Sequence, residues 1–407
     1  MGSCMSLHVR SSFVAALLGA ALFVPVRAQA QDAPPAEFDS WQLPGWTFTP
    51  GVTFGWLHDT NVAVAFPPAD VGKTAADNLF EMEPFGSLEY YSPRTNFAGS
   101  YHGFVRRYFD FDELNSLEQR AEVSLRHRVT RRLTFSAGEA FLRTPTTDQL
   151  ELNGVPFERN GSRYNAAYSG LEARVSRTVT ATARYEFTWV DFDRKDALLN
   201  GGFINGVHGD VTRAFDARSS AGAEYSVRWA DLDQGTRHLS FQNTGALYRY
   251  RVGERTNFEA AAGFAHLIDH LNDVSKTGLY LRAGLTHRMQ RATLGASYER
   301  SYVPSFAFGG TNQSQETRGY VTMPLSRNRL YLEESAAWRR TDPLLAQEIP
   351  LDSIWIHTTV GYALVRYFRI EGYHAFSRQD TRLFAGQINR NIIGVQFVVA
   401  RPVRIEQ

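Results

Sequence analysis

Cysteine and lysine are almost absent from this chain, and no long apolar run occurs. The one cysteine, Cys4, lies next to the start, so the residues after it can form neither a disulfide nor a thiolate metal site. Three of the 43 basic residues are lysines, at Lys73, Lys195 and Lys276, and the others are arginines. The apolar stretch at residues 13–24 is shorter than the roughly 20 residues that a spanning helix needs. The composition therefore argues against thiol chemistry and against helical membrane spans.

Positive and negative charges are nearly equal in number. The formal net charge is +1, and removing residues 1–30, which contain Arg10 and Arg27 but no acid, changes it to −1. A protein that binds nucleic acid would need a basic surface. We therefore expect no nucleic-acid partner.

The first thirty residues predict a secretory signal peptide. Arg10 supplies the positive start, residues 13–24 supply the apolar segment, and Ala28-Gln29-Ala30 fits a cleavage site. Residues 31–45 are Pro-rich and lack periodicity, which predicts a periplasmic lead-in. The alternation described next predicts a transmembrane barrel over residues 46–399 and a periplasmic tail over 400–407.

From about Trp46 onward, apolar residues alternate with polar or charged ones. Between residues 215 and 229, for example, apolar side chains at Ala223, Tyr225 and Val227 alternate with polar ones. A period of two indicates a β-strand with one apolar and one polar face. When nearly every strand shows this pattern after a secretion signal, a transmembrane β-barrel is predicted.

Short Arg-rich turns divide the alternating stretches. With a longer, more polar connection between each pair of turns, the spacing predicts about eighteen antiparallel strands in an up-and-down barrel. An even count places both termini on one side, and short turns on that side are typical of outer-membrane barrels. The turns are predicted at residues 92–95, 129–132, 175–178, 211–214, 252–255, 289–292, 325–328 and 365–367.

The free-energy cost of placing charges in lipid indicates which face of each strand meets lipid and which meets the lumen. An arginine that faces lipid near the midplane costs about 2–4 kcal/mol, so arginines such as Arg120, Arg126 and Arg128 must face the lumen. The apolar rows then face lipid, and tryptophans near strand ends, such as Trp56 and Trp189, fit an interfacial girdle. A soluble β-sandwich or solenoid is the alternative, but its turns need not be short on one side.

The inward-facing charges are the candidate pore-lining residues. Because opposite charges neighbour one another, we expect weak charge selectivity and a hydrogen-bonding wall suited to a hydrated, carbohydrate-like permeant. The alternative is that these rows of neighbouring opposite charges only solvate and stiffen the barrel wall. The candidates are Glu118, Arg120, Glu122, Arg126, Arg128, Arg184, Glu186, Asp216, Arg218, Glu224, Arg228, Arg282, Glu299, Arg369 and Glu371.

Aromatic residues in the loops and upper strands could form a sugar-stacking track, or they could pack within loops or in the girdle. These are Phe109, Phe111, Phe157, Phe192, Tyr302, Phe306 and Phe308. Acidic clusters at residues 110–113 and 191–193 have no Ca²⁺-ligand spacing, which favours solvated loops. His266 and His270 lack a metal-site spacing for a strand. We expect no metal, no cofactor and, without a G-x-S-x-G motif, no catalytic centre.

Residues 48–62 carry a family resemblance. An opening strand that ends in Asp59-Thr60-Asn61-Val62, followed by R-V-T/S-R-type turns, resembles the outer-membrane β-barrel porin family associated with exopolysaccharide secretion. The resemblance implies a passive conduit in the outer membrane of a Gram-negative bacterium, to which a periplasmic polysaccharide-export protein delivers polymer. Gly394, Phe397 and Val399 partly fit the signal read by the barrel-assembly machinery.

The sequence thus predicts a non-enzymatic channel embedded in outer-membrane lipid, with polysaccharide export as its function. The alternative is a general diffusion or sugar-permeable porin that passes small hydrophilic solutes. Such porins usually have one long loop that folds into the lumen, and residues 59–78 and 144–162 are long enough. An outer-membrane enzyme and a soluble β-rich binding module are the remaining alternatives.

Overall fold

The computed structural model describes residues 44–65, 75–194, 199–232, 237–307, 310–326, 329–344, 349–381 and 386–405. The predicted signal peptide and most of the lead-in lie outside these residues. Among the described residues, no helix is long and apolar enough to cross a membrane.

Nearly all of the described chain is β-strand, with two short 3-10 helices, Asp112–Leu114 (η1) and Thr147–Leu150 (η2). The strands are Gly45–Asp59 (β1), Asp77–Tyr91 (β2), Thr95–Tyr108 (β3), Ser116–Arg128 (β4), Leu133–Thr144 (β5), Ser162–Arg174 (β6), Val179–Phe192 (β7), Gly202–Ala214 (β8), Ser219–Leu232 (β9), Arg237–Arg251 (β10), Thr256–Asp269 (β11), Val274–Arg288 (β12), Thr293–Pro304 (β13), Thr311–Ser326 (β14), Leu330–Pro343 (β15), Leu351–Val365 (β16), Phe368–Thr381 (β17), Gly386–Ala400 (β18) and Val403–Ile405 (β19).

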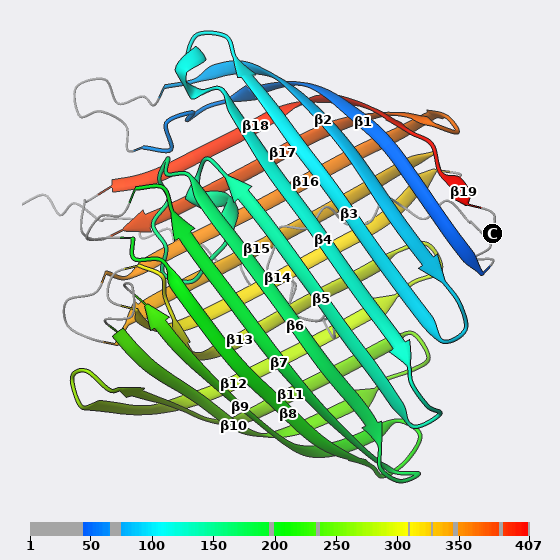
Figure 1. Ribbon diagram of the computed structural model, residues 1–407, viewed down its shortest axis with the longest axis vertical. Helices are drawn as coiled ribbons and strands as arrows, with labels where there is room; N and C mark the ends of the chain where they lie inside the picture. The colour runs from blue at the N-terminus through cyan, green and yellow to red at the C-terminus, as the bar shows by residue number, and fades with distance from the viewer. Residues whose placement is uncertain are drawn as a thin grey trace, which may run out of the picture.

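The sheet closes on itself. Each strand from β1 to β17 pairs antiparallel with the next, and β18 returns to β1 with a register from Gly51↔Ala400 to Asp59↔Ile392. The short strand β19 pairs with the start of β1. Closure leaves no unpaired edge, which is the condition for a sheet to sit in lipid. The predicted antiparallel up-and-down barrel of eighteen strands is therefore confirmed (Figure 1).

Seven of the eight turns lie where the sequence places them, to within a residue or two. The turn predicted at 211–214 is wrong, because β8 continues to Ala214 and the turn is formed by residues 215–218. The Asp216 carboxylate accepts backbone N–H bonds from Arg218 (2.6 Å) and Ser219 (2.7 Å), which closes an Asx-type turn. The Ser219 hydroxyl and these two N–H groups hold the pKa of Asp216 below its ordinary value.

The contacts of a segment that crosses the barrel show which face of the sheet is the inner one. The connection between β5 and β6 contacts Trp355 on β16 and Gln379 on β17, strands on the opposite side of the ring, so these side chains must face the lumen. The alternation along each strand then assigns the remaining residues. Phe54, Trp56 and Phe264 face outward and are exposed, as the sequence predicts for lipid-facing rows.

A charged residue on β5 interrupts the outer face. Glu139, in the middle of β5, lies between Val123 of β4 and Ala167 of β6 and is exposed. Its Oε1 accepts a hydrogen bond from Asn165 Nδ2 at 2.7 Å. A carboxylate in the middle of a lipid-facing strand has a free-energy cost for insertion into lipid. This cost is smaller than the roughly 2–4 kcal/mol of an arginine.

We therefore expect Glu139→Leu to stabilise the barrel in lipid by about 1–2 kcal/mol. The measurement is urea-induced unfolding from phospholipid vesicles, followed by tryptophan fluorescence. The matched control is Glu186→Leu on β7, which removes an inward carboxylate that pairs with Arg184 at 3.2 Å and should give no gain. A loss of stability in Glu139→Leu would mean that this residue does not face lipid.

Candidate functional site

The connection between β5 and β6, residues 145–161, crosses the lumen. Trp355 Nε1 on β16 donates to the backbone oxygen of Asp148 (2.9 Å). Gln379 on β17 bonds the segment twice, donating to Val155 O (3.0 Å) and accepting from Phe157 N (2.7 Å). These contacts and the ion pair of Asp148 with Arg390 place the short helix η2 inside the ring of strands. Of the two loops that the sequence shows to be long enough to fold inward, residues 59–78 and 144–162, the one at 144–162 therefore does so.

A buried arginine fastens the first part of this loop. Arg390 on β18 pairs with Asp59 at the end of β1 (2.7 Å) and with Asp148 of the loop (3.0 Å). The three side chains are 3%, 0% and 6% exposed. A charge-assisted network of this kind holds its partners in one geometry, because losing either charge leaves the other without a partner in a dry environment.

A second ionic contact fastens the middle of the loop. Arg339 Nη1 on β15 donates to the backbone oxygen of Glu151 (2.6 Å), and Arg318 Nη1 on β14 contacts the Glu151 carboxylate (2.8 Å). Glu316 bridges both arginines, at 2.7 Å from Arg339. The loop is thus attached to β14 and β15 as well as to β16, β17 and β18.

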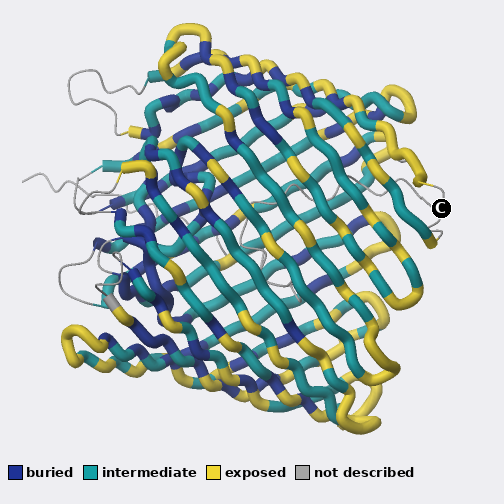
Figure 2. The backbone as a smooth tube through the Cα atoms, in the orientation of Figure 1, coloured by how far each residue is buried: buried dark blue, intermediate teal, exposed yellow. Residues whose placement is uncertain are grey.

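Apolar packing completes the attachment. The Phe157 ring lies 5.5 Å from that of Trp355, in a buried cluster with Val64 and Ile388. A larger apolar cluster, which includes Phe192 and residues of β9 to β13, fills the same end of the barrel. Figure 2 shows buried residues concentrated at this end, where the longer connections lie, while the turns at the other end are exposed. Side chains therefore fill the lumen more densely near the loop end than near the turn end.

Protonation of Asp148 should not release the loop at moderate acidity. Burial would raise its pKa, but the charge of Arg390 and hydrogen bonds from Thr146, Arg390 and Ser377 outweigh burial and hold the pKa below the ordinary 3.8. Because the folded pKa is depressed, this contribution to loop closure is complete above the unfolded value and is lost only as pH falls through the lower, folded value.

We therefore expect single-channel conductance to stay constant from pH 8 to about 5 and to rise only below about 4. A stepwise increase between pH 7 and 5 would contradict the assignment of this ion pair as the fastening of the loop.

The structure places thirteen of the fifteen predicted pore-lining residues in the strands, on the face that carries Trp355 and Gln379. Several are paired: Glu118 lies between Arg106 and Arg120 (2.9 and 2.6 Å), and Arg369 contacts Glu371 at 3.1 Å. Asp216 and Arg218 belong to the turn between β8 and β9 instead of the wall. The inward residues are Glu118, Arg120, Glu122, Arg126, Arg128, Arg184, Glu186, Glu224, Arg228, Arg282, Glu299, Arg369 and Glu371.

The sequence does not identify the residues that hold the loop. Asp59 belongs to the segment that carries the family resemblance, and its place in the alternation of β1 also puts it on the polar face. Arg390, Arg339 and Arg318 carry no local signal that separates them from other inward arginines. Their role depends on which loop residue reaches them across the lumen.

The proposed sugar-stacking track is not supported by the rings named for it. Phe157, Phe192, Tyr302 and Phe306 are 4%, 1%, 6% and 3% exposed, because they pack within the loop end of the barrel. Phe109 lies against the outward-facing Trp56, with ring centroids 5.0 Å apart. Phe111 packs against a third apolar cluster, and Phe308 lies outside the described residues. Loop and girdle packing, the alternative, accounts for the described rings.

The acidic clusters and histidines form no metal site in the described part of the chain. Near the first cluster, the carboxylate of Asp77 accepts backbone N–H bonds from Asp110 and Phe111 (2.9 and 3.2 Å). His266 bonds Thr277 on the neighbouring strand at 2.9 Å. The backbone of the first cluster and the His266 ring therefore have structural partners.

Comparison with solved structures finds distant barrels. Acinetobacter baumannii OccAB4 aligns with 89% of this chain and 99% of its own, at 10% identity and a TM-score of 0.44. Pseudomonas aeruginosa OpdQ aligns with 89% of this chain and 98% of its own, at 10% identity and a TM-score of 0.43. The ferric citrate transporter FecA aligns with 83% of this chain and 60% of its own, at 10% identity and a TM-score of 0.40.

No protein-family model matches the chain, and a search of curated proteins finds no match. The class that the fold defines is thus a closed antiparallel β-barrel with an apolar exterior, a charged interior and a loop across its lumen.

Proposed function

We propose that this protein is an outer-membrane channel for hydrophilic solutes, of the diffusion-porin kind. A barrel of eighteen strands is wide enough to enclose water. Its outer face is apolar, its inner face carries paired charges, and its short turns lie at one end, as in outer-membrane barrels. A catalytic role has no support in the arrangement of these residues.

The observation that carries this proposal is the inward loop. Residues 145–161 are attached to five strands of the opposite wall by hydrogen bonds and ion pairs. A narrowed bore selects small solutes by size, whereas a polymer conduit needs a wide path. Among the two functions considered from the sequence, the loop therefore favours small-solute diffusion.

Exopolysaccharide export is the second candidate. The observation that favours it is that exposed arginines, such as Arg94, Arg131 and Arg177, outnumber exposed carboxylates at the turn end, which is the periplasmic end under this proposal. A periplasmic export protein and the barrel-assembly machinery would be the protein partners in that case.

Liposome swelling tests the proposal. Vesicles containing the refolded protein should swell quickly in neutral monosaccharides, more slowly in disaccharides, and hardly at all in dextran. Absence of swelling in every sugar would show a sealed barrel and overturn the proposal. Equal swelling in small sugars and short dextrans would favour the wide conduit instead.

A further inference from the structure

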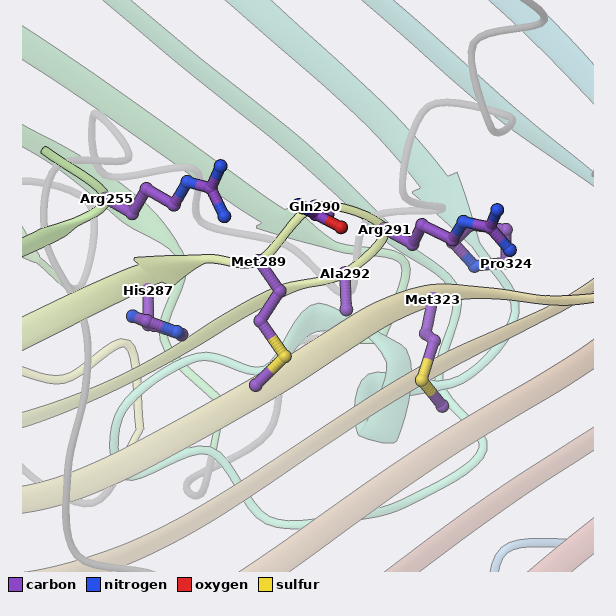
Figure 3. A pocket seen from close by; sticks show the side chains of 8 residues that line it. All are labelled: Arg255, His287, Met289, Gln290, Arg291, Ala292, Met323 and Pro324. Carbon is purple, nitrogen blue, oxygen red and sulfur yellow. The ribbon is translucent and has the colours of Figure 1, made fainter.

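The turn end of the barrel carries an excess of exposed arginines. Every short turn contains or adjoins at least one, and Figure 2 shows this end as exposed. Figure 3 shows two of them, Arg255 and Arg291, reaching from neighbouring turns beside a shallow groove. The exposed arginines at this end are Arg94, Arg126, Arg128, Arg131, Arg132, Arg174, Arg177, Arg213, Arg218, Arg251, Arg255, Arg288, Arg291, Arg329, Arg366, Arg401 and Arg404.

Few carboxylates balance these charges. Exposed acids among the described residues of this end are Glu89, Glu172, Asp216 and Glu254. The salt bridge seen there, within the described ranges, joins Arg126 and Glu172 at 3.2 Å.

The loop end is arranged differently. There Arg163 pairs with Asp193 (3.5 Å), Arg340 with Asp342 (3.0 Å) and Arg378 with Asp380 (2.7 Å). The barrel is thus electrically asymmetric, with the positive charge at its turn end.

Four of the arginines line the mouth itself. Arg128, Arg174, Arg251 and Arg288 are the last residues of β4, β6, β10 and β12. Each continues the inward row of its strand: Arg251 lies two residues beyond Arg249, for example, which pairs with Glu259 inside the barrel. We call these four residues the arginine mouth.

Lipid headgroups do not account for the arginine mouth, because inward side chains cannot reach them. Arg213 provides the contrast: it lies one residue before the end of β8 and follows the outward row of Val207 and Val211. It is therefore placed to contact headgroups, whereas the arginine mouth faces solute that enters the lumen.

The spacing of the arginine mouth suits a ligand with several charges. Residues on strands two apart are separated by about 10 Å, so β4 and β6 present one pair of guanidinium groups and β10 and β12 another. Guanidinium binds carboxylate bidentately. A linear chain with repeated carboxylates could engage two or more groups at once, and this multivalency raises its affinity over that of a single carboxylate.

We propose that the arginine mouth binds acidic polysaccharide at the turn end of the channel. The ligand class is a linear polyanion whose carboxylates pair with Arg128, Arg174, Arg251 and Arg288. This inference rests on the proposed function only in that the lumen must open to water at the turn end. Binding there does not require that the polymer pass the loop.

Current block in planar bilayers tests this. The probe is polygalacturonate of defined length, added to one side at a time, and dextran of equal length is the neutral comparison. Orientation is assigned with Ser176→Cys in a turn and a membrane-impermeant thiol reagent. Polygalacturonate should block from the turn side, and the block rate should fall at least tenfold between about 0.1 and 1 M salt, because the Debye length falls from about 10 to 3 Å.

The variant is R128Q/R174Q/R251Q/R288Q, with Arg213→Gln as the matched control. The fourfold variant should lower the turn-side block rate by at least about tenfold, and the control should leave it unchanged. Equal block from both sides, an unaltered rate in the fourfold variant, or an equal loss in Arg213→Gln would overturn the proposal. An equal loss of block rate in Arg213→Gln would mean that arginines in contact with lipid headgroups, and not the arginine mouth, cause the block.

Liposome swelling in neutral sugars distinguishes failure of this inference from failure of the proposed function. A protein that passes neutral sugars but shows no turn-side block would be a channel whose arginine mouth does not bind polyanion. Galacturonate monomer gives the remaining distinction: a block rate equal to that of the polymer at equal carboxylate concentration would contradict multivalent binding.

Discussion

Replacing Arg390 with methionine should destabilise the barrel by about 3–5 kcal/mol, because two buried carboxylates lose their partner. Asp59 and Asp148 are almost fully buried around this guanidinium, at 2.7 and 3.0 Å. The same change should loosen the loop from β18. We expect a lower urea midpoint for unfolding from vesicles and frequent brief conductance increases in single-channel records.

Arg378→Met on β17 is the control, since Arg378 pairs at 2.7 Å with Asp380 of the same strand but both side chains are 41–43% exposed. Exposed pairs contribute about 0–1 kcal/mol, so this variant should behave almost as the wild type. Equal stability losses in the two variants would show that burial of the Arg390 network does not matter.

Shortening the inward loop should raise conductance severalfold. Replacing residues 147–157 with a short Gly-Ser linker removes Asp148, Glu151 and Phe157, and with them the contacts to the opposite wall. The strands keep their own pairing, and Arg390 keeps Asp59 as its partner. An eighteen-stranded ring without a crossing segment leaves a wide aqueous lumen.

The comparison for this variant is the same linker in place of residues 110–114, in the connection between β3 and β4. That change should leave conductance near the wild-type value. An unaltered conductance in the 147–157 variant would place the narrowest part of the channel elsewhere.

The barrel itself is predictable from the sequence because lipid penalises exceptions to the alternation. An arginine such as Arg120 in the wrong register would face hydrocarbon, so the pattern assigns faces and strand number together. The turn at residues 215–218 was misplaced for a local reason. Residues on both sides alternate without interruption, and the bend depends on Asp216 capturing two backbone N–H groups.

The path of the loop could not be predicted in this way. Asp148 and Arg390 are 242 residues apart, and they meet because closure of β18 against β1 brings Arg390 to the lumen that the β5–β6 connection crosses. The same applies to the aromatic candidates, since the burial of Phe157 depends on meeting Trp355. Sequence periodicity describes what each strand faces, while contacts across the lumen depend on closure of the whole ring.

Labelling of two adjacent positions tests most directly whether a water-filled lumen lies inside an apolar cylinder. The chain has no cysteine after Cys4, so Arg184→Cys on the inner face and Tyr185→Cys on the outer face give clean single sites. In vesicles, a small water-soluble maleimide should label the cysteine at position 184 and spare that at 185, and a lipid-confined reagent should do the reverse. Labelling of position 185 by the water-soluble reagent, with 184 reached from lipid, would contradict this assignment of the faces and the channel proposed from it.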